Sequence, residues 1–392
     1  MKYIQDRIDF CICRPMLGIP LFFLVMYTVF FLSFYGLGAW LTEYLGTIFF
    51  YLTEILRSFL LSIQTNEKIV LFLMGVLSDI ASVLSFLPQT AIFFFLIKFL
   101  SDSGYMARAV FVADTVLYHF GLSGNALIPL AIGCGCTVPA VVASRELDPN
   151  ERKILLFSLP FLLCNARFPV LFFLSNTFFP QHKALTAFLF YLLSLFIVFL
   201  SCKLSSFRKS APPLIINLPD YQMPKLYPLL CEAKIKSSEY LNRTATVIFL
   251  CSIGFRLSSF LTPQFRFTEI KPQSLLSLLG EHLSFFFAPL GFGKASFSAA
   301  LFAGFFAKEN LLFVLEMLSK REISASLSIP ARISFMSFSM LYLPCFSSVV
   351  TVFKETNLRK TLFLLFRTFL IAYTVSLILY TISDILVTFV KI

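Results

Sequence analysis

Three cysteines of this chain lie close to prolines inside long apolar stretches. The pairs are Cys136 with Pro139, Cys164 with Pro169, and Cys345 with Pro344. Because proline lacks a backbone N–H, it interrupts a helix and leaves a carbonyl oxygen without its usual partner. Thiolate sulfur together with carbonyl or carboxylate oxygen suits a borderline divalent transition metal better than Na⁺ or Mg²⁺. The pattern therefore predicts a metal-cation pathway, although any one cysteine taken alone is more typical of a small buried apolar side chain.

The octet Gly133-Cys134-Gly135-Cys136-Thr137-Val138-Pro139-Ala140 interrupts an otherwise apolar run. Its two glycines lower helix stability, and Pro139 cannot donate to the carbonyl of Gly135. A second break is expected where Pro169 removes the donor for the carbonyl of Asn165. At membrane depth, such carbonyls occur only where protein buries them or where they line a wet cavity. Broken helices of this kind are where transporters place their ion and substrate sites.

Ionisable residues also lie in or beside the apolar segments. They are Asp102, Arg108, Asp114, Arg167, Arg256, Lys308, Glu309 and Arg367. Such residues are costly inside a membrane and usually pair with one another or line a pathway. We expect Asp102 and Glu309 to be carboxylates near the cation pathway. The structural or gating charges we expect are Arg108, Asp114, Arg167 and Lys308. Two salt bridges are alternatives to these roles: Lys308 with Glu309, and Asp114 with Arg108.

Other chemistries are poorly supported by the residues. Gly293-Lys294 is similar to part of a phosphate loop, but Ala288 stands where a Walker A motif requires glycine. The three histidines lack the spacing of a zinc protease site. A redox enzyme using Cys134-x-Cys136 is a distant alternative, because neither thiol has a basic neighbour in sequence. The net charge of +11 does not indicate nucleic-acid binding, because the basic residues flank apolar runs or lie in one loop.

The composition is that of a membrane protein. The 392 residues are 58% hydrophobic and 14% charged, whereas soluble domains carry about 25% charged residues. The long uncharged runs, each near the ~20 residues that span hydrocarbon, are Pro15–Thr42, Ala184–Cys202, Ile333–Phe353 and Thr368–Ser383. We therefore predict an all-α integral membrane protein, a polytopic bundle of about eight to ten transmembrane helices with broken helices. Whether residues 69–87 cross the membrane stays open.

The chain divides into a short lead and two membrane halves. Residues 1–14 form the lead, 15–202 the first half, 203–240 a basic loop, and 241–392 the second half with a C-terminal helix. The basic residues of the lead and of the loop predict that both lie in the cytoplasm. Glycines at 121, 124 and 133 have an echo at 291, 293 and 304, which is typical of an internal two-fold repeat. The nine cysteines, an odd number mostly in apolar segments, argue against a disulfide framework.

Motifs from one end of the chain to the other carry a family resemblance. They are Asp6-Arg-Ile-Asp9 with Leu17-Gly-Ile-Pro20, Asp102-Ser-Gly-Tyr-Met-Ala-Arg108, Gly121-Leu-Ser-Gly124, the octet, Cys164-Asn-Ala-Arg167, Ala288-Pro-Leu-Gly-Phe-Gly293, Gly304-Phe-Phe-Ala-Lys-Glu309 and Leu343-Pro-Cys345. This set resembles the membrane domain of the FeoB ferrous iron transporters. The resemblance implies a permease of the bacterial inner membrane, with two gate modules at about 88–202 and 241–355. It also implies Fe²⁺ as the transported ion and no permanently bound cofactor.

The chain departs from the FeoB pattern at several positions. Ser101 stands where the family usually has an acidic residue, and Thr137, Asn165 and Lys294 replace the usual Asn, Gly and acidic or polar residues. FeoB proteins normally begin with a GTP-binding domain, which we expect this chain to lack. The resemblance then implies a separate small GTPase and a FeoA-like protein as partners, besides the lipid bilayer and further copies of the chain.

Two rival functions stay open. A nucleoside-type symporter would share the gate module, but it would need a polar pocket for a sugar and a base. The breaks of this chain instead carry thiols and little Asn or Gln. The second rival is a non-transporting membrane scaffold derived from a permease, which the altered positions and the expected lack of a GTPase domain keep open.

Overall fold

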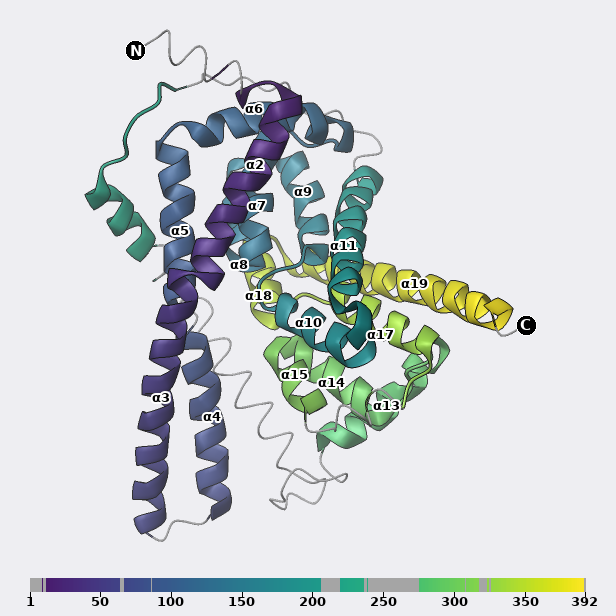
Figure 1. Cartoon of the computed structure of the whole chain (residues 1–392). Coiled ribbons are helices and arrows are strands. Elements are labelled where there is room, and N and C mark those ends of the chain that lie inside the picture. The colour runs from purple at the N-terminus through teal and green to yellow at the C-terminus, as the bar shows by residue number, and fades with distance from the viewer. Residues whose placement is uncertain are drawn as a thin grey trace. The chain divides into compact units, whose positions relative to one another are not determined.

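The computed structural model describes residues 9, 12–63, 67–85, 87–205, 219–235, 238, 275–306, 308–316, 323 and 326–390. These residues form helices joined by turns, and no strand occurs among them (Figure 1). The predicted all-α class is thereby confirmed. The span predicted at 244–261 and the side chain of Glu309 lie outside the described part of the chain.

Four described helical regions are long and apolar enough to cross a membrane. They are Met16–Ser62, Pro180–Ser205, Ile329–Glu355 and Leu358–Phe389. Two bent helix pairs meet the same criterion, which gives up to six spans if each pair counts as one. These helices agree with a polytopic membrane protein. The larger number of about eight to ten stays a prediction, since some apolar segments lie outside the described ranges.

The first of two units formed by internal contacts comprises Met1–Leu56, Ser78–Leu159 and Phe199–Thr246. Its complete helices are α2 (Pro15–Phe30), α5 (Leu87–Asp102), α6 (Tyr105–Leu117), α7 (Leu127–Gly135), α8 (Thr137–Ala143) and α9 (Pro149–Ser158), with parts of α3 (Leu37–Ser62), α4 (Glu67–Ser85) and α11 (Lys183–Ser205). Short turns are the π-helix Phe31–Tyr35 and the 3-10 helices Tyr118–Phe120, Gly124–Ala126 and Ser144–Glu146. Helix α2 packs on α5 and α6, and α6 in turn packs on α7, the helix that ends at the chain break before α8.

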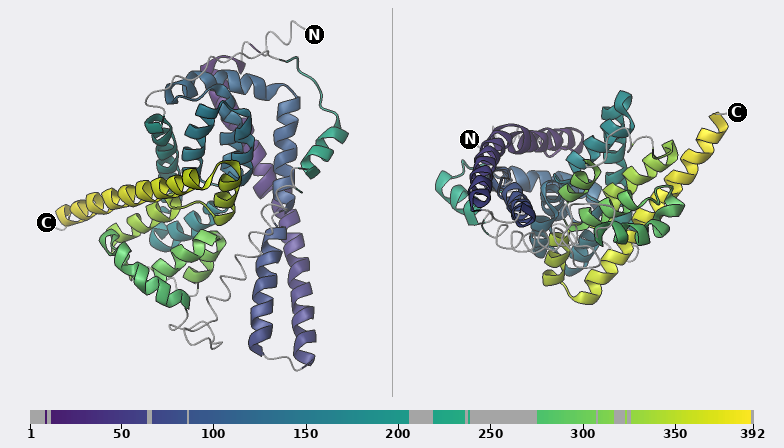
Figure 2. Two further views of the ribbon diagram at one scale, coloured as in Figure 1. Left: turned by 180° about the vertical axis from the view of Figure 1, so that it is seen from behind. Right: turned by 90° about the horizontal axis from the view of Figure 1, so that it is seen from below.

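The second unit comprises Arg57–Leu77, Pro160–Val198 and Val247–Ile392. Its helices are α10 (Arg167–Phe178), α13 (Leu275–Phe287), α14 (Ala295–Phe306), α15 (Lys308–Glu316), α17 (Ile329–Leu341), α18 (Phe346–Glu355) and α19 (Leu358–Val390). Helix α17 packs along α19, a single long helix visible in both further views (Figure 2). Ser337 and Ser376 join these two helices through a 3.0 Å hydrogen bond between their hydroxyls. Buried rings of Phe292, Phe335 and Phe338 fill the space beside them.

Glycines in the left-handed conformation make the sharp bends. Helices α5 and α6 meet at 84° around Gly104, whose φ is 82°. Helices α13 and α14 meet at 103° around Gly291, whose φ is also 82°. Gly121 (φ 74°) and Gly291 each follow a 3-10 turn at the end of a helix. The sequence echo between these two glycines therefore extends to their backbone conformation.

Replacing Gly291 by alanine is expected to lower the free energy of unfolding by about 2–4 kcal/mol. A Cβ at this position would lie 2.4 Å from the ring of Tyr380, and an L-residue is strained at this φ. Thermal unfolding of the purified protein in detergent measures the effect. Gly46→Ala is the matched control, because Gly46 lies within α3 and its nearest neighbour would be 3.9 Å from the new Cβ. An equal loss of stability in the two variants would contradict this reading of the bend.

Candidate functional site

The break predicted at the glycine-cysteine octet is present in the first unit. Helix α7 ends at Gly135 and α8 begins at Thr137, while Cys136 between them is extended, with φ −153° and ψ 133°. Gly135 packs against Phe93 of α5, and a Cβ on this glycine would lie 3.2 Å from the ring. Cys136 is half-buried. The sequence thus placed this helix break correctly, because glycine and proline weaken both sides of it.

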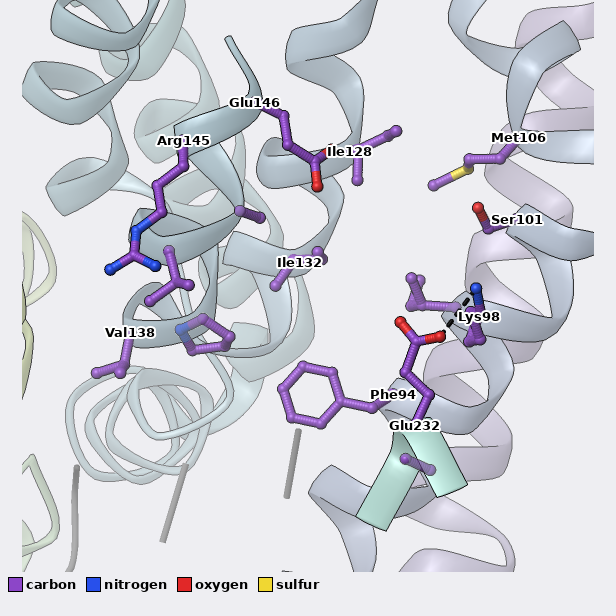
Figure 3. A pocket seen from close by; sticks show the side chains of 15 residues that line it. Phe94, Lys98, Ser101, Met106, Ile128, Ile132, Val138, Arg145, Glu146 and Glu232 are labelled. Atoms are coloured by element: carbon purple, nitrogen blue, oxygen red, sulfur yellow. Dashed lines mark ion pairs between the residues drawn. The ribbon is translucent and has the colours of Figure 1, made fainter. Parts of the chain in front are cut away.

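A cavity of about 490 Å³ lies beside this break, lined by residues of the first unit (Figure 3). Its charged lining residues are Lys98, Arg145, Glu146 and Glu232. The Nζ of Lys98 lies 2.8 Å from a carboxylate oxygen of Glu232 and 2.8 Å from one of Asp102. Among the described residues that line this cavity, the two basic and two acidic side chains balance in formal charge. Asp102, expected near the pathway, lies in an ion pair at the end of α5.

Two carboxylates hold the turn that precedes α7. An oxygen of Asp114 accepts a 2.7 Å hydrogen bond from the backbone N–H of Gly124. Glu151, which is 3% exposed, accepts from the backbone N–H and the hydroxyl of Ser123. Burial raises the pKa of Glu151, and the hydrogen bonds from Ser123 oppose that rise. The alternative salt bridge between Asp114 and Arg108 is wrong, because each side chain has a different partner.

Arg108 of α6 is 1% exposed and joins three segments of the first unit. Its Nε and NH2 donate to the carboxylate of Asp9 at 2.6 and 3.2 Å. Its NH1 donates to the carbonyls of Gly104 and Pro219, each at 2.8 Å. The ring of Tyr221 stacks on the guanidinium at 3.7 Å, and its hydroxyl donates to Asp9. Arg108 therefore joins Asp9 and residues 219–221 to the turn between α5 and α6.

Removing the charge of Asp9 should loosen this attachment. The hydrogen bond from Arg108 holds the pKa of Asp9 below its usual 3.8. A lowered carboxyl pKa contributes stability that is fully present above pH 3.8 and is lost as the pH falls through the folded-state pKa. Asp9→Asn is expected to remove this pH dependence and about 1 kcal/mol of local stability at neutral pH. Hydrogen exchange of the backbone amides of Asp220 and Tyr221 measures it, with the exposed Glu43→Gln as control. Unchanged exchange in Asp9→Asn would contradict the assignment.

In the second unit, two non-helical segments are joined by the side chain of Arg167. These segments are residues 162–166, before α10, and residues 342–345, between α17 and α18. Arg167 is 2% exposed, and it donates to the carbonyl of Tyr342 at 3.1 Å and to that of Pro160, in the 3-10 turn Leu159–Phe161 just before the first segment, at 2.7 Å. Longer contacts of 3.5 Å reach the carbonyls of Leu162 and Leu343. One buried cation thus supplies hydrogen bonds to carbonyls of both segments.

Lys308 brings a second buried cation to the same place. It is 3% exposed, and its Nζ donates to the carbonyl of Leu343 at 2.9 Å. The same ammonium lies 3.7 Å from the centre of the Tyr342 ring. Both basic residues therefore contact the segment that interrupts the helix between α17 and α18, so the expected role as structural or gating charges has a defined location in the fold.

Cys164 and Cys345 each belong to one of the two segments that Arg167 contacts. The sulfur of Cys345 lies 3.2 Å from the hydroxyl of Ser347 and 3.1 Å from that of Ser348. The carbonyl of Cys164 accepts from the N–H of Arg167 at 2.9 Å. The Cys345 sulfur is thus held by hydroxyls at the start of α18, and the main chain at Cys164 is held by Arg167.

The prediction of an unpaired carbonyl at Asn165 is wrong. This carbonyl accepts a 3.3 Å hydrogen bond from the N–H of Phe168. Pro169 removes only the donor four residues ahead, and the tighter bond from three residues ahead replaces it. The break itself remains, with α10 beginning only at Arg167.

The predicted site residues are divided between the two units. Cys136 and Asp102 belong to the first unit, whereas Cys164 and Cys345 belong to the second. Within the described residues, no group of three or more His, Cys, Asp or Glu side chains is placed to hold a metal ion. Roles for these residues in a metal pathway stay predictions.

The sequence analysis did not identify several groups that bind the buried charged side chains or the turn before α7. They are Asp9, Glu151, Tyr221 and the carbonyls of Tyr342 and Leu343. The one available signal was Pro344, which marks residues 342–343 as the end of a helix. The oxygen and sulfur donors in residues 342–345 are the chemistry that a borderline metal ion accepts.

Comparison with known proteins adds an independent line of evidence. Residues 83–178 match the Gate family, described as nucleoside recognition. The chain is 30% identical over 370 residues to "Fe(2+) transporter FeoB" of Staphylococcus aureus (strain COL), which covers 91% of this chain and 55% of that protein. It is 31% identical over 390 residues to the Campylobacter jejuni protein of the same name, covering 93% of this chain and 63% of the relative.

A third relative joins two names in one protein. It is the "Fe(2+) transport protein A/Fe(2+) transporter FeoB fusion protein" of Porphyromonas gingivalis, 27% identical over 416 residues, with 91% of this chain and 49% of the relative covered. The chain therefore spans about half to two thirds of the length of the curated relatives it matches. No solved structure matches the chain.

Proposed function

We propose that this chain, which is homologous to FeoB proteins over 91% of its length, forms a transmembrane pathway for Fe²⁺. The observation that carries the proposal is a homology running through every cysteine-bearing helix break. Fe²⁺ accepts both thiolate sulfur and oxygen ligands, and interrupted helices expose such groups at membrane depth. We assign pathway roles to the thiols of Cys136, Cys164 and Cys345 and to the carboxylates of Asp102 and Glu309.

The surroundings of the pathway are part of the same proposal. We place the chain in the bacterial inner membrane with its N-terminus in the cytoplasm, where basic flanking residues favour that orientation. Two gate modules, at about 88–202 and 241–355, flank the basic loop 203–240. The chain acts as a transporter and not as an enzyme, with Fe²⁺ as its substrate.

The partners proposed are a small GTPase, a FeoA-like protein and further copies of the chain. The Porphyromonas gingivalis relative supports the second of these, because its name joins a transport protein A with FeoB in one polypeptide. In this proposal the GTPase supplies a nucleotide-driven step to transport.

Uptake of radiolabelled Fe²⁺ by the full chain in proteoliposomes tests the function. We expect uptake above that of empty liposomes, competition by excess Mn²⁺ or Co²⁺, and faster uptake when a cognate small GTPase and GTP are added. Empty liposomes and liposomes carrying heat-denatured protein are the controls. No uptake under either condition would favour the non-transporting scaffold and reject the proposal.

A nucleoside-type symporter is the second candidate, favoured by the match of residues 83–178 to a nucleoside recognition family. A nucleoside needs several polar groups around its sugar and base. The cavity beside the α7–α8 break is instead lined by charged and apolar side chains, with Ser101 as its uncharged polar member. Saturable uptake of labelled uridine, unaffected by Mn²⁺ or Co²⁺, would establish this alternative over Fe²⁺.

A further inference from the structure

The segment between α17 and α18 is arranged as a receptor for a positive charge. The carbonyl of Leu343 accepts from the ammonium of Lys308 at 2.9 Å, and the carbonyl of Tyr342 accepts from Arg167 at 3.1 Å. Both basic side chains are almost completely buried. Carbonyl oxygens at an interrupted helix are the groups that membrane proteins use to coordinate cations. Here such carbonyls are in contact with side-chain cations.

The ring of Tyr342 completes one side of this receptor. Its face lies 3.7 Å from the Lys308 ammonium, and a cation over a tyrosine face is attracted by the ring quadrupole. The ring is held in place, because its hydroxyl donates to the carbonyl of Leu301 at 3.1 Å. Gly304 leaves room for that hydroxyl, which would lie 2.5 Å from a Cβ at position 304. The site is therefore preformed by a fixed ring and a fixed main chain.

Sulfur donors lie beside these oxygens. Cys345 follows Leu343 by two positions. Cys164 lies three positions before Arg167, whose guanidinium contacts the carbonyls of Tyr342 and Leu343. A site that offers carbonyl oxygen and two ionisable thiols fits a borderline divalent metal ion. A bound divalent ion would displace the thiol protons, so two thiolates would balance its charge.

We propose that residues 342–345, with Cys164, form a cation site of the second unit in which the Lys308 ammonium is a built-in occupant. A divalent metal ion enters only when this ammonium leaves the Leu343 carbonyl. The Lys308 ammonium and a metal ion bound at the same carbonyl would repel one another strongly in a poorly solvated site. Lys308 is then a tethered competitor that keeps the site closed to metal. The inference deepens the proposed Fe²⁺ pathway and rests on it for the identity of the physiological ion.

Equilibrium binding of Co²⁺ to the full chain in lipid nanodiscs tests the site without measuring transport. Co²⁺ bound by thiolate gives a ligand-to-metal charge-transfer absorption, which reports sulfur coordination directly. We compare the wild-type protein with Lys308→Met, whose unbranched side chain is one atom shorter and uncharged, and with Lys308→Gln as a second neutral variant. Lys308→Arg is the matched control that retains a cation.

Both neutral variants are expected to bind Co²⁺ at least about tenfold more tightly than wild type, because the self-occupied state no longer reduces the apparent affinity. The charge-transfer band should appear with this binding and disappear in Lys308→Met/Cys345→Ser. Lys308→Arg should bind as weakly as wild type. Cys202→Ser in the Lys308→Met background should leave the band unchanged, since the Cys202 sulfur contacts the hydroxyl of Ser158 at 3.1 Å and serine makes a similar contact there.

Unchanged or weaker Co²⁺ binding in Lys308→Met and Lys308→Gln would overturn the proposal. So would failure of both variants to fold, because Lys308 would then be a structural anchor and no competitor. Binding is measured apart from uptake, so the two ideas fail separately. A tight, thiolate-coordinated Co²⁺ in Lys308→Met would sustain the site even if the wild-type chain transported no Fe²⁺.

Discussion

Replacing Arg167 by alanine is expected to lower the free energy of unfolding by about 3–6 kcal/mol, because hydrogen bonds from a charged donor contribute about 1.5–3 kcal/mol each. Two short bonds are lost, to the carbonyls of Pro160 and Tyr342. Arg167 is 2% exposed, so water is poorly placed to replace it. The two chain segments that it joins should separate. Thermal unfolding in detergent and the yield of monodisperse protein measure the loss.

Two variants show whether the geometry of Arg167 or only its charge is needed. Arg167→Lys keeps the charge, but a single ammonium cannot donate to carbonyls on both sides as the guanidinium does. We expect it to recover less than half of the loss. Arg359→Ala, which removes an exposed arginine at the start of α19, should stay within about 0.5 kcal/mol of wild type. Full recovery in Arg167→Lys would show that the bridging bonds contribute little.

The sequence predicted where helices stop better than it predicted what satisfies their ends. Gly135 and Pro139 weaken the backbone locally, so the break at Cys136 followed from these residues alone. The same rule located the interruptions near Pro169 and Pro344. Local rules suffice there because the missing donor is a property of proline itself. They failed at Asn165, where a donor three residues ahead replaced the missing one.

Sequence patterns did not predict the hydrogen-bond partners that lie far away in the chain from the buried charged residues. The sequence offers Asp114 as an alternative partner of Arg108, because the two are close in the chain, but Arg108 binds Asp9, which is 99 positions away. Lys308 reaches a carbonyl 35 positions away. A backbone carbonyl carries no side-chain signature, so composition and spacing give no sign that it will accept a buried cation. The charged residues were therefore recognised as unusual, whereas their partners required the fold.

Replacing Cys136 by serine is expected to reduce Fe²⁺ uptake in proteoliposomes by about tenfold or more, with little change in stability, because serine preserves size and removes the thiolate. The prediction rests on the proposed pathway. Cys136 is half-buried and extended at the α7–α8 break, so its side chain is not needed to fill a helix interior. An oxygen in place of sulfur is a poorer ligand for Fe²⁺ but leaves the backbone of the break intact.

Cys202→Ser separates loss of a pathway thiol from loss of any buried thiol. Cys202 is 1% exposed, and its sulfur lies 3.1 Å from the hydroxyl of Ser158, so serine there makes a similar contact. We expect this control to retain uptake near the wild-type level, with initial rates normalised to the amount of folded protein reconstituted. A fall of equal size in both variants would trace the defect to packing. Wild-type uptake in Cys136→Ser would remove this thiol from the pathway, because a ligand in direct contact with the ion cannot change from sulfur to oxygen without altering its affinity.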